Sequence, residues 1–242
     1  MSAGERWTDE AVILEFERWV YVPPDGVHLE DERRLLLHLP KRWGQSRVWR
    51  SSAPDEEKAC ELIGETIGAV RAFGGGRLVW HTGEGLSPPF MDECLARLGF
   101  ETSEELHVLA FSLVDGQRSR LPRLGFHEVG EPNEEGASLA LRFLAFSDVG
   151  SEHGGEDIRK AMGAAGAQLV GETLRLWGAA TRKAFRGRGA YGALVLERCR
   201  VGIELGATLA LTKANIATSG PTLERAGFRV VATERRHALE VS

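Results

Sequence analysis

The spacing of hydrophobic and polar residues changes several times along this chain and predicts a mixed succession of helices and strands. In the first half, apolar residues at helical spacing predict three helices, at residues 8–21, 52–73 and 88–98. Glycines or prolines stand at the ends of these segments, as expected where a helix stops or starts. Shorter apolar runs predict strands at residues 47–50, 77–81 and 106–114. Residues 27–39 are ambiguous, and segments 28–29 and 35–39 can be strands around a charged turn at 30–34.

The second half shows a similar succession. Strands are predicted at residues 126–129, 174–181 and 207–212, and helices at residues 190–205 and 221–226. An alanine-rich segment with an acidic start predicts a further helix at residues 156–167. Residues 138–146 are apolar throughout, so this segment can be either a helix or a strand.

A basic turn joins the strand at 174–181 to the helix at 190–205. It carries four cationic side chains, which are Arg182, Lys183, Arg186 and Arg188. Gly187 and Gly189 let the backbone turn tightly, because glycine accepts a positive φ without a steric penalty. The first N–H groups of a helix have no acceptor within the helix, and the helix dipole makes this end partly positive. The turn therefore predicts a site for phosphate or pyrophosphate.

Three interpretations of this turn are open. The first is a solvated basic loop without a ligand. The second is a dinucleotide-binding fold, because Gly187, Gly189 and Gly192 spell G-x-G-x-x-G. However, the chain ends 50 residues after Gly192, which is too short for the rest of a doubly wound sheet. The next strand also ends in Thr212 and Lys213 rather than in the acidic residue that binds a ribose.

The third interpretation rests on a resemblance. Residues 186–190, RGRGA, resemble the R-x-x-G-x-[GA] loop of the GNAT N-acetyltransferase superfamily, whose amides hold the pyrophosphate of acetyl-coenzyme A. The order of helix, strand, short helix and Gly-Phe pair that follows also resembles the family, so that the likeness covers residues 173–241. Two positions depart from the pattern. Tyr191 stands where the loop usually has its second glycine or alanine, and Leu223 stands where many members have a tyrosine.

The resemblance implies a GNAT-like α/β fold with a mixed central sheet, acetyl-CoA as the cofactor, and acetyl transfer to an amine. It implies that the strand before the loop pairs with the pantetheine arm, that the loop holds the pyrophosphate and that Asn215 lies nearby. The implied cofactor-binding residues are Trp177, Ala179, Thr181, Arg186, Gly187, Arg188, Gly189, Ala190, Tyr191 and Asn215. The histidines have no metal-ligand spacing, so no metal site is expected.

Two residues are candidates for catalysis. Glu172 lies at the start of the cofactor strand, where the family sometimes places a carboxylate, and would act as the general base. Ser219 or water would give a proton to the leaving thiolate, because no tyrosine occupies the usual position. Each residue has a second interpretation: Glu172 as a solvated strand-end residue, and Ser219, like Asn215, as a turn residue that bonds its own backbone.

The order of helix, strand, helix, Gly-Phe and strand occurs twice in the chain. LARLGF at residues 95–100 matches LERAGF at residues 223–228 and indicates a degenerate internal repeat. We therefore expect two tandem GNAT-like halves, a degenerate one at residues 1–118 and an acetyl-CoA-binding one at residues 119–242. At the place of the glycine loop, the first half has residues 51–54, SSAP, followed by three acids that would repel phosphate. One acetyl-CoA per chain is expected.

Composition adds limits to this picture. A net charge of −5 gives no sign of a nucleic-acid partner. The N-terminus lacks the apolar core of a signal peptide, and no apolar run approaches the roughly 18 residues that a membrane helix needs. Cys60, Cys94 and Cys199 are odd in number and far apart in the sequence, which indicates a reducing cytoplasm.

The acceptor would be an amine on a small molecule or a peptide, and the acidic surface weakly favours a cationic one. The sequence does not set the oligomeric state, and a homodimer is one option. A second function stays open, which is a non-catalytic module that binds coenzyme A or an acyl-CoA. Leu223 favours this alternative, because it removes the usual proton donor.

Overall fold

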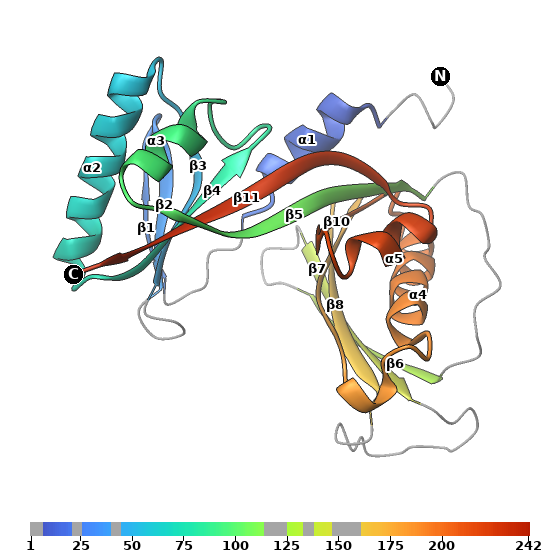
Figure 1. Ribbon diagram of the computed structural model, residues 1–242. Coiled ribbons are helices and arrows are strands. Elements are labelled where there is room, and N and C mark those ends of the chain that lie inside the picture. The colour runs from blue at the N-terminus through green and yellow to red at the C-terminus, as the bar shows by residue number, and fades with distance from the viewer. Residues whose placement is uncertain (1–6, 21–25, 40–44, 114–124, 133–137, 147–160) are drawn as a thin grey trace. The chain divides into compact units, whose positions relative to one another are not determined.

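The structure is a computed structural model, and it describes residues 7–20, 26–39, 45–113, 125–132, 138–146 and 161–242 (Figure 1). The helices are α1 Asp9–Glu17, α2 Glu56–Ala72, α3 Met91–Arg97, α4 Ala190–Glu204 and α5 Gly220–Arg225, with a short 3₁₀ turn η3 at Lys183–Phe185. The strands are β1 Val27–Glu30, β2 Arg34–Leu39, β3 Gln45–Ser51, β4 Gly76–Gly83, β5 Glu101–Ser112, β6 Gly125–Pro132, β7 Ser138–Phe146, β8 Gly163–Val170, β9 Thr173–Thr181, β10 Leu209–Asn215 and β11 Arg229–Val241. In the described part of the chain, no helix is both long and apolar enough to cross a membrane.

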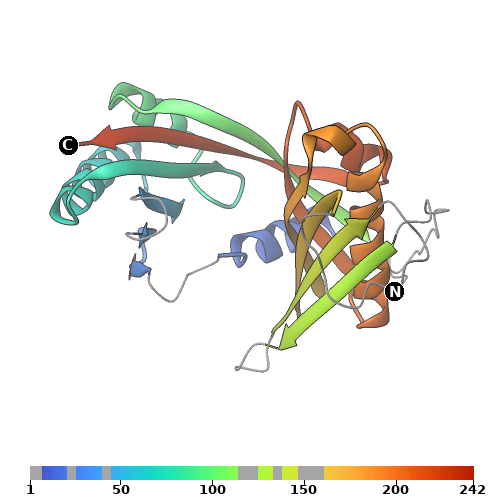
Figure 2. The same ribbon diagram turned by 90° about the horizontal axis from the view of Figure 1, so that it is seen from below.

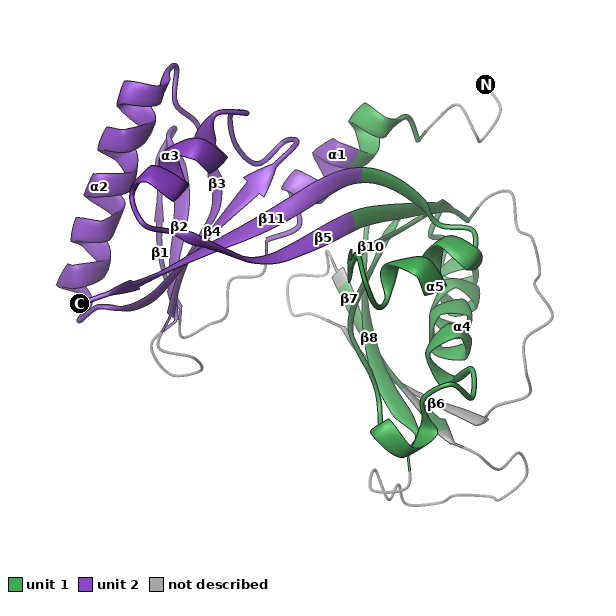
Figure 3. Ribbon diagram, viewed as in Figure 1, with its two compact units in different colours: residues 1–12, 108–231 green, residues 13–107, 232–242 purple. Residues whose placement is uncertain are grey.

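The chain divides into two compact units (Figure 3). Unit 1 consists of residues 1–12 and 108–231, and unit 2 consists of residues 13–107 and 232–242. Strands β5 and β11 each give residues to both units, and most of β11 belongs to unit 2 although it is the last strand of the chain. The predicted boundary at residue 118 lies outside the described residues and stays a prediction.

Unit 2 has a mixed sheet with strand order β1-β2-β3-β4-β11-β5. Strands β3 and β4 pair in parallel, whereas β1 with β2, β2 with β3 and β4 with β11 pair antiparallel. Helices α2 and α3 pack against each other, and α2 also packs on β4. Their apolar faces bury a core that includes Leu36, Val48, Leu62, Ile63, Leu78, Trp80, Met91 and Leu95.

Unit 1 holds strands β10-β9-β8-β7-β6 in that order. Strands β9 and β10 pair in parallel, and the others pair antiparallel with their neighbours. Helix α4 lies along one face of β7, β8 and β9, as the two views of the ribbon show (Figures 1 and 2). The core between them includes Leu141, Phe143, Leu174, Leu176, Leu194, Val195 and Leu223.

The same order of elements therefore occurs twice: antiparallel strands, a helix, a strand parallel to the one before that helix, and a short helix. In unit 2 these are β2, β3, α2, β4 and α3, and in unit 1 they are β8, β9, α4, β10 and α5. The predicted α/β class with mixed sheets is confirmed.

One predicted element is wrong. Residues 156–167 do not form a helix where they are described, because β8 begins at Gly163. Two glycines of this segment are required by close packing in the sheet. A Cβ atom added to Gly166 would lie 2.5 Å from the indole ring of Trp177, and one added to Gly163 would lie 2.7 Å from the carbonyl oxygen of Ala180. The segment at 138–146, which the sequence left open, is strand β7.

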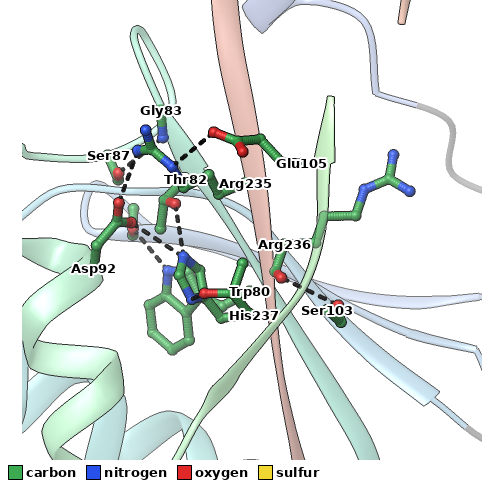
Figure 4. A network of polar contacts seen from close by, with 12 residues as sticks. Trp80, Thr82, Gly83, Ser87, Asp92, Ser103, Glu105, Arg235, Arg236 and His237 are labelled. Carbon is green, nitrogen blue, oxygen red and sulfur yellow. Dashed lines mark hydrogen bonds and ion pairs between the residues drawn. The ribbon is translucent and has the colours of Figure 1, made fainter. Parts of the chain in front are cut away.

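A polar network joins α3, β4, β5 and β11 within unit 2 (Figure 4). His237 is buried at its centre, with Nε2 lying 3.1 Å from Asp92 Oδ1 and 3.1 Å from the hydroxyl of Thr82. The Nδ1 atom of His237 lies 3.2 Å from the hydroxyl of Thr102. Arg235, which lies on β11 like His237, donates a hydrogen bond to the Asp92 carboxylate. Burial lowers the pKa of His237 below its usual value, although the Asp92 carboxylate acts in the opposite direction.

Unit 2 should therefore lose stability in mild acid. Because the folded protein disfavours the protonated form of His237, the unfolded chain binds more protons as the pH falls through about 6.5, the pKa of an unfolded histidine. This contribution to stability is present above that pH and declines below it. Urea unfolding at about pH 8 and about pH 5 should show a smaller acid-induced loss in His237→Asn than in the unmodified chain.

The exposed His28 offers a matched control. The His28→Asn variant should keep the full acid-induced loss. If His237→Asn loses as much stability in acid as the unmodified chain, His237 is not the group that titrates.

Candidate functional site

The candidate site begins where two parallel strands of unit 1 separate. The ladder between β9 and β10 starts with Thr173 opposite Leu209 and ends with Leu176 opposite Thr212. The Thr212 hydroxyl donates a hydrogen bond of 3.1 Å to the carbonyl oxygen of Leu176 at this last pair. Beyond it, the described register pairs β9 only with β8. The edge of β9 at residues 177–181 is thus available to pair with an extended ligand.

A bulge marks the same place on the β8 side. The register between β8 and β9 shifts between Ala164 and Gly166, and Gly178 has a φ of +62°. Trp177, whose exposed fraction is 43%, packs its indole ring against Gly166. Because a bulge bends its strand, it turns the last residues of β9 away from the regular path.

The glycine loop after η3 has the shape that the sequence predicted. Gly187 and Gly189 have φ values of +75° and +82°, in the left-handed region that favours glycine. Gly189 is the N-cap of α4, and no side chain caps this helix start. A Cβ atom added at Gly187 or Gly189 would meet no atom of the described residues within 4 Å. No described residue therefore covers the backbone at the start of α4, and its first N–H groups have no acceptor in the helix.

The four cations of the turn are all exposed. Arg186 Nε lies 3.4 Å from the carbonyl oxygen of Thr181, which holds that side chain between the end of β9 and the helix start. The guanidinium of Arg188 lies 5.5 Å from the ring centre of Phe185. Among the described residues, no carboxylate forms an ion pair with Arg186 or Arg188. Both charges are thus available to a phosphate.

Arg198 is an important residue of this region that the sequence analysis missed. Its side chain is buried on the sheet-facing side of α4, with only 2% of its surface exposed. It donates hydrogen bonds to three carbonyl oxygens, those of Leu194 at 3.0 Å, Gly166 at 2.9 Å and Trp177 at 3.5 Å. Burial lowers the pKa of Arg198 to about 10. The signal in the sequence was an arginine on the apolar face of a helix, four residues after Leu194.

The start of α4 also approaches α5. Helix α4 packs on α5, and Tyr191, in the first turn of α4, interacts with Ser219, the N-cap residue of α5. Burial raises the pKa of Tyr191, whereas the charge of Arg198 and the Ser219 hydroxyl act in the opposite direction. The structure therefore brings Ser219 and the glycine loop together.

The other two predicted polar residues make local contacts. Asn215 Oδ1 accepts hydrogen bonds from the Ala217 amide at 3.0 Å and the Thr218 hydroxyl at 3.3 Å, which is the turn role that the sequence left open for it. The Glu172 carboxylate accepts a hydrogen bond of 2.9 Å from the Thr208 hydroxyl. Glu172 precedes Trp177 by five residues of strand, about 16 Å, so the structure does not bring it to the loop.

Solved structures share this fold over nearly its full length. A GCN5-related N-acetyltransferase from Kribbella flavida matches with a TM-score of 0.64 at 14% identity, over 88% of this chain and 89% of the other. A tandem GNAT protein from the clavulanic acid biosynthesis pathway matches with a TM-score of 0.65 at 12% identity, over 97% and 87%. A functionally unknown conserved protein from Staphylococcus epidermidis matches with a TM-score of 0.66 at 13% identity, over 93% and 97%.

No protein-family model and no curated protein matches the chain. At these low identities the likeness concerns the fold alone. It nevertheless covers both units, and it includes a protein described as a tandem GNAT. The chain therefore has the GNAT fold, as its glycine loop and the order of its elements predicted.

Proposed function

We propose that this protein is an acetyl-CoA-dependent N-acetyltransferase and that unit 1 binds the cofactor. One observation carries the proposal: the ladder between β9 and β10 ends before a helix start that is turned by glycines and flanked by Arg186 and Arg188, with which no described carboxylate forms an ion pair. An extended arm that ends in a pyrophosphate suits such a site, because strand edges pair with amides and helix starts bind phosphate.

The loop and β9 would divide the binding between them. The amides at Gly187, Gly189, Ala190 and Tyr191, with Arg186 and Arg188, hold the pyrophosphate. The edge of β9 at Trp177, Ala179 and Thr181 pairs with the pantetheine arm. Bound acetyl-CoA supplies the thioester, and a nitrogen–carbon bond to the amine replaces its carbon–sulfur bond. Transfer also requires that the amine lose a proton and that the leaving sulfur gain one.

Unit 2 is built differently at the corresponding place. At the end of β3, the Ser51 amide donates a hydrogen bond of 2.8 Å to the carbonyl oxygen of Leu86, and Trp80 Nε1 bonds the Ser51 hydroxyl at 3.1 Å. The start of α2 is capped by the Asp55 carboxylate, which accepts from the Lys58 amide at 2.8 Å. The capping carboxylate and two further acids in the first turn of α2 oppose a phosphate there. We therefore expect one acetyl-CoA per chain.

A non-catalytic coenzyme A or acyl-CoA module is the second candidate. Leu223 favours it, because this residue is 1% exposed and gives the core of unit 1 an apolar side chain where a proton donor is usual in the resembled family. The two functions differ in one measurement. Release of free coenzyme A from acetyl-CoA in the presence of a panel of amines supports the enzyme, and binding without release supports the module.

Coenzyme A should raise the Tm of the chain, because a ligand that binds only the folded state stabilises it. The Gly189→Val variant should abolish this shift, since it places a β-branched residue at a φ of +82° where the backbone must approach phosphate. Calorimetric titration should return one site per chain in the unmodified protein.

Gly206→Val is the matched control, because Gly206 ends α4 with a φ of +90° and equally open surroundings. Both variants should lower the Tm of the free protein, but only Gly189→Val should remove the response to coenzyme A. An undiminished response in Gly189→Val would place the site elsewhere. Two equivalent calorimetric sites would contradict the assignment to unit 1 alone.

If Glu172 is the general base, Glu172→Gln should lower kcat by roughly 10²-fold and leave the Kd for coenzyme A unchanged. The glutamine keeps an oxygen that can accept from the Thr208 hydroxyl, so the junction of β9 and β10 should stay intact. Equal kcat values for the variant and the unmodified chain would give Glu172 a structural role only.

If Ser219 passes a proton to the leaving sulfur, Ser219→Ala should lower kcat by about 10²-fold, with little change in cofactor binding. Thr218→Ala is the matched control, because it removes a neighbouring exposed hydroxyl that bonds only within its own turn. Unchanged turnover in Ser219→Ala would leave water as the proton source.

A further inference from the structure

Two cysteines that are far apart in the sequence meet in unit 2. Cys60 lies on α2 and Cys94 lies on α3, and these helices pack against each other. One guanidinium nitrogen, Arg97 Nη2, lies 3.2 Å from the sulfur of Cys94 and 3.9 Å from the sulfur of Cys60. The two thiols are therefore close in space, although their separation along the sequence suggested isolated thiols.

A second contact places the Cys94 thiol beside the turn of α2 that carries Cys60. The sulfur of Cys94 lies 3.9 Å from the carbonyl oxygen of Glu56. In an α-helix this oxygen accepts the hydrogen bond of the residue four positions later, which is Cys60. The Glu56 carboxylate also holds Arg97 at 2.7 Å, and this ion pair keeps the guanidinium beside the two sulfurs.

The two thiols differ in access to solvent. Cys94 is fully buried, and burial raises its pKa, although the Arg97 guanidinium favours the thiolate. Cys60 is partly exposed and can meet a dissolved reagent. The third cysteine, Cys199, is buried in the core of unit 1, where burial raises its pKa to about 12. The pair thus has an accessible sulfur, a sheltered partner and a cation, which is the environment of a reactive rather than an inert thiol.

We propose that Cys60 and Cys94 form a reversible oxidation site. A low-molecular-weight disulfide oxidises the two thiols to a Cys60–Cys94 disulfide by thiol–disulfide exchange. The Cys60 thiolate attacks one sulfur of the reagent, forms a mixed disulfide and releases one thiolate. Cys94, after giving its proton to water, attacks the Cys60 sulfur and releases the second thiolate. The two protein thiols lose two electrons, which reduce the reagent to two thiols, and Arg97 stabilises the attacking thiolate.

A metal site is a weaker explanation of the same pair. Soft metal ions bind thiolates, but structural sites usually have four ligands. Among the described residues no group of three or more candidate metal ligands occurs. The guanidinium between the sulfurs would also repel a cation. The same positive charge favours thiolates, so it suits thiol exchange.

The test incubates the full chain with glutathione disulfide and then counts free thiols in denaturant. The count should fall from three to one, and the tryptic peptides of Cys60 and Cys94 should appear as a single linked species. Dithiothreitol should restore three thiols. Because the link joins α2 to α3, the oxidised form should unfold at a higher Tm than the reduced form.

Single variants test the order of events. In Cys94→Ser the reaction should stop at a glutathione adduct on Cys60, whereas Cys60→Ser should stay unmodified because its remaining thiols are buried. Arg97→Gln should slow the exchange roughly tenfold, the effect of about one pKa unit, and Arg97→Lys should restore most of the rate.

Several results would overturn the proposal. They are three free thiols after prolonged incubation, a glutathione adduct in the unmodified chain that never closes, or a link between two chains in place of the Cys60–Cys94 peptide. A rate in Arg97→Gln equal to that of the unmodified chain would remove Arg97 from the site. Each of these outcomes is independent of acetyl transfer, because all the residues involved belong to unit 2.

Discussion

The candidate site depends on a buried arginine. Arg198 reaches from α4 into the sheet and bonds the carbonyl oxygens of Gly166 and Trp177, on the two strands that meet at the bulge. Hydrogen bonds to a charged group contribute about 1.5–3 kcal/mol each, and a buried cation without them would be strongly unfavourable. The position of α4, the irregular course of β9 and the direction of the glycine loop therefore depend on one another.

The two units show that one order of elements can support different chemistry. In unit 1 the helix after the parallel strand begins at a glycine with no capping side chain, so its amides are available. In unit 2 the corresponding helix begins at Asp55, whose carboxylate takes up such an amide and adds negative charge. A fold does not carry a function by itself. The residues at a single helix start decide whether it can receive an anion.

The sequence predicted local features better than contacts between distant segments. The glycine loop and the helix after it were foreseen, because glycine positions and apolar spacing act over a few residues. The mixed sheet was foreseen only through the resemblance to the GNAT superfamily. The first residues of β8 were predicted to be helical, because the contacts that require Gly163 and Gly166 there are made with β9 and leave no local signal in the sequence. Arg198 was also missed because its role depends on distant segments. Besides a carbonyl group of its own helix, it bonds carbonyl groups of strands β8 and β9. The meeting of Cys60 and Cys94 depends on how α2 packs on α3 and has no local signature.

The path of β11 has a consequence for how the chain acquires its structure. Most of this strand completes the sheet of unit 2, yet it is made after every other element that the structure describes. Its partner β4, which pairs with residues 234–241, leaves the ribosome about 160 residues earlier. The earlier-made part of unit 2 must therefore wait with an open sheet edge until β11 has been synthesised. Such a long-range pairing slows folding, and a shortened C-terminus would damage the part of the protein that was synthesised first.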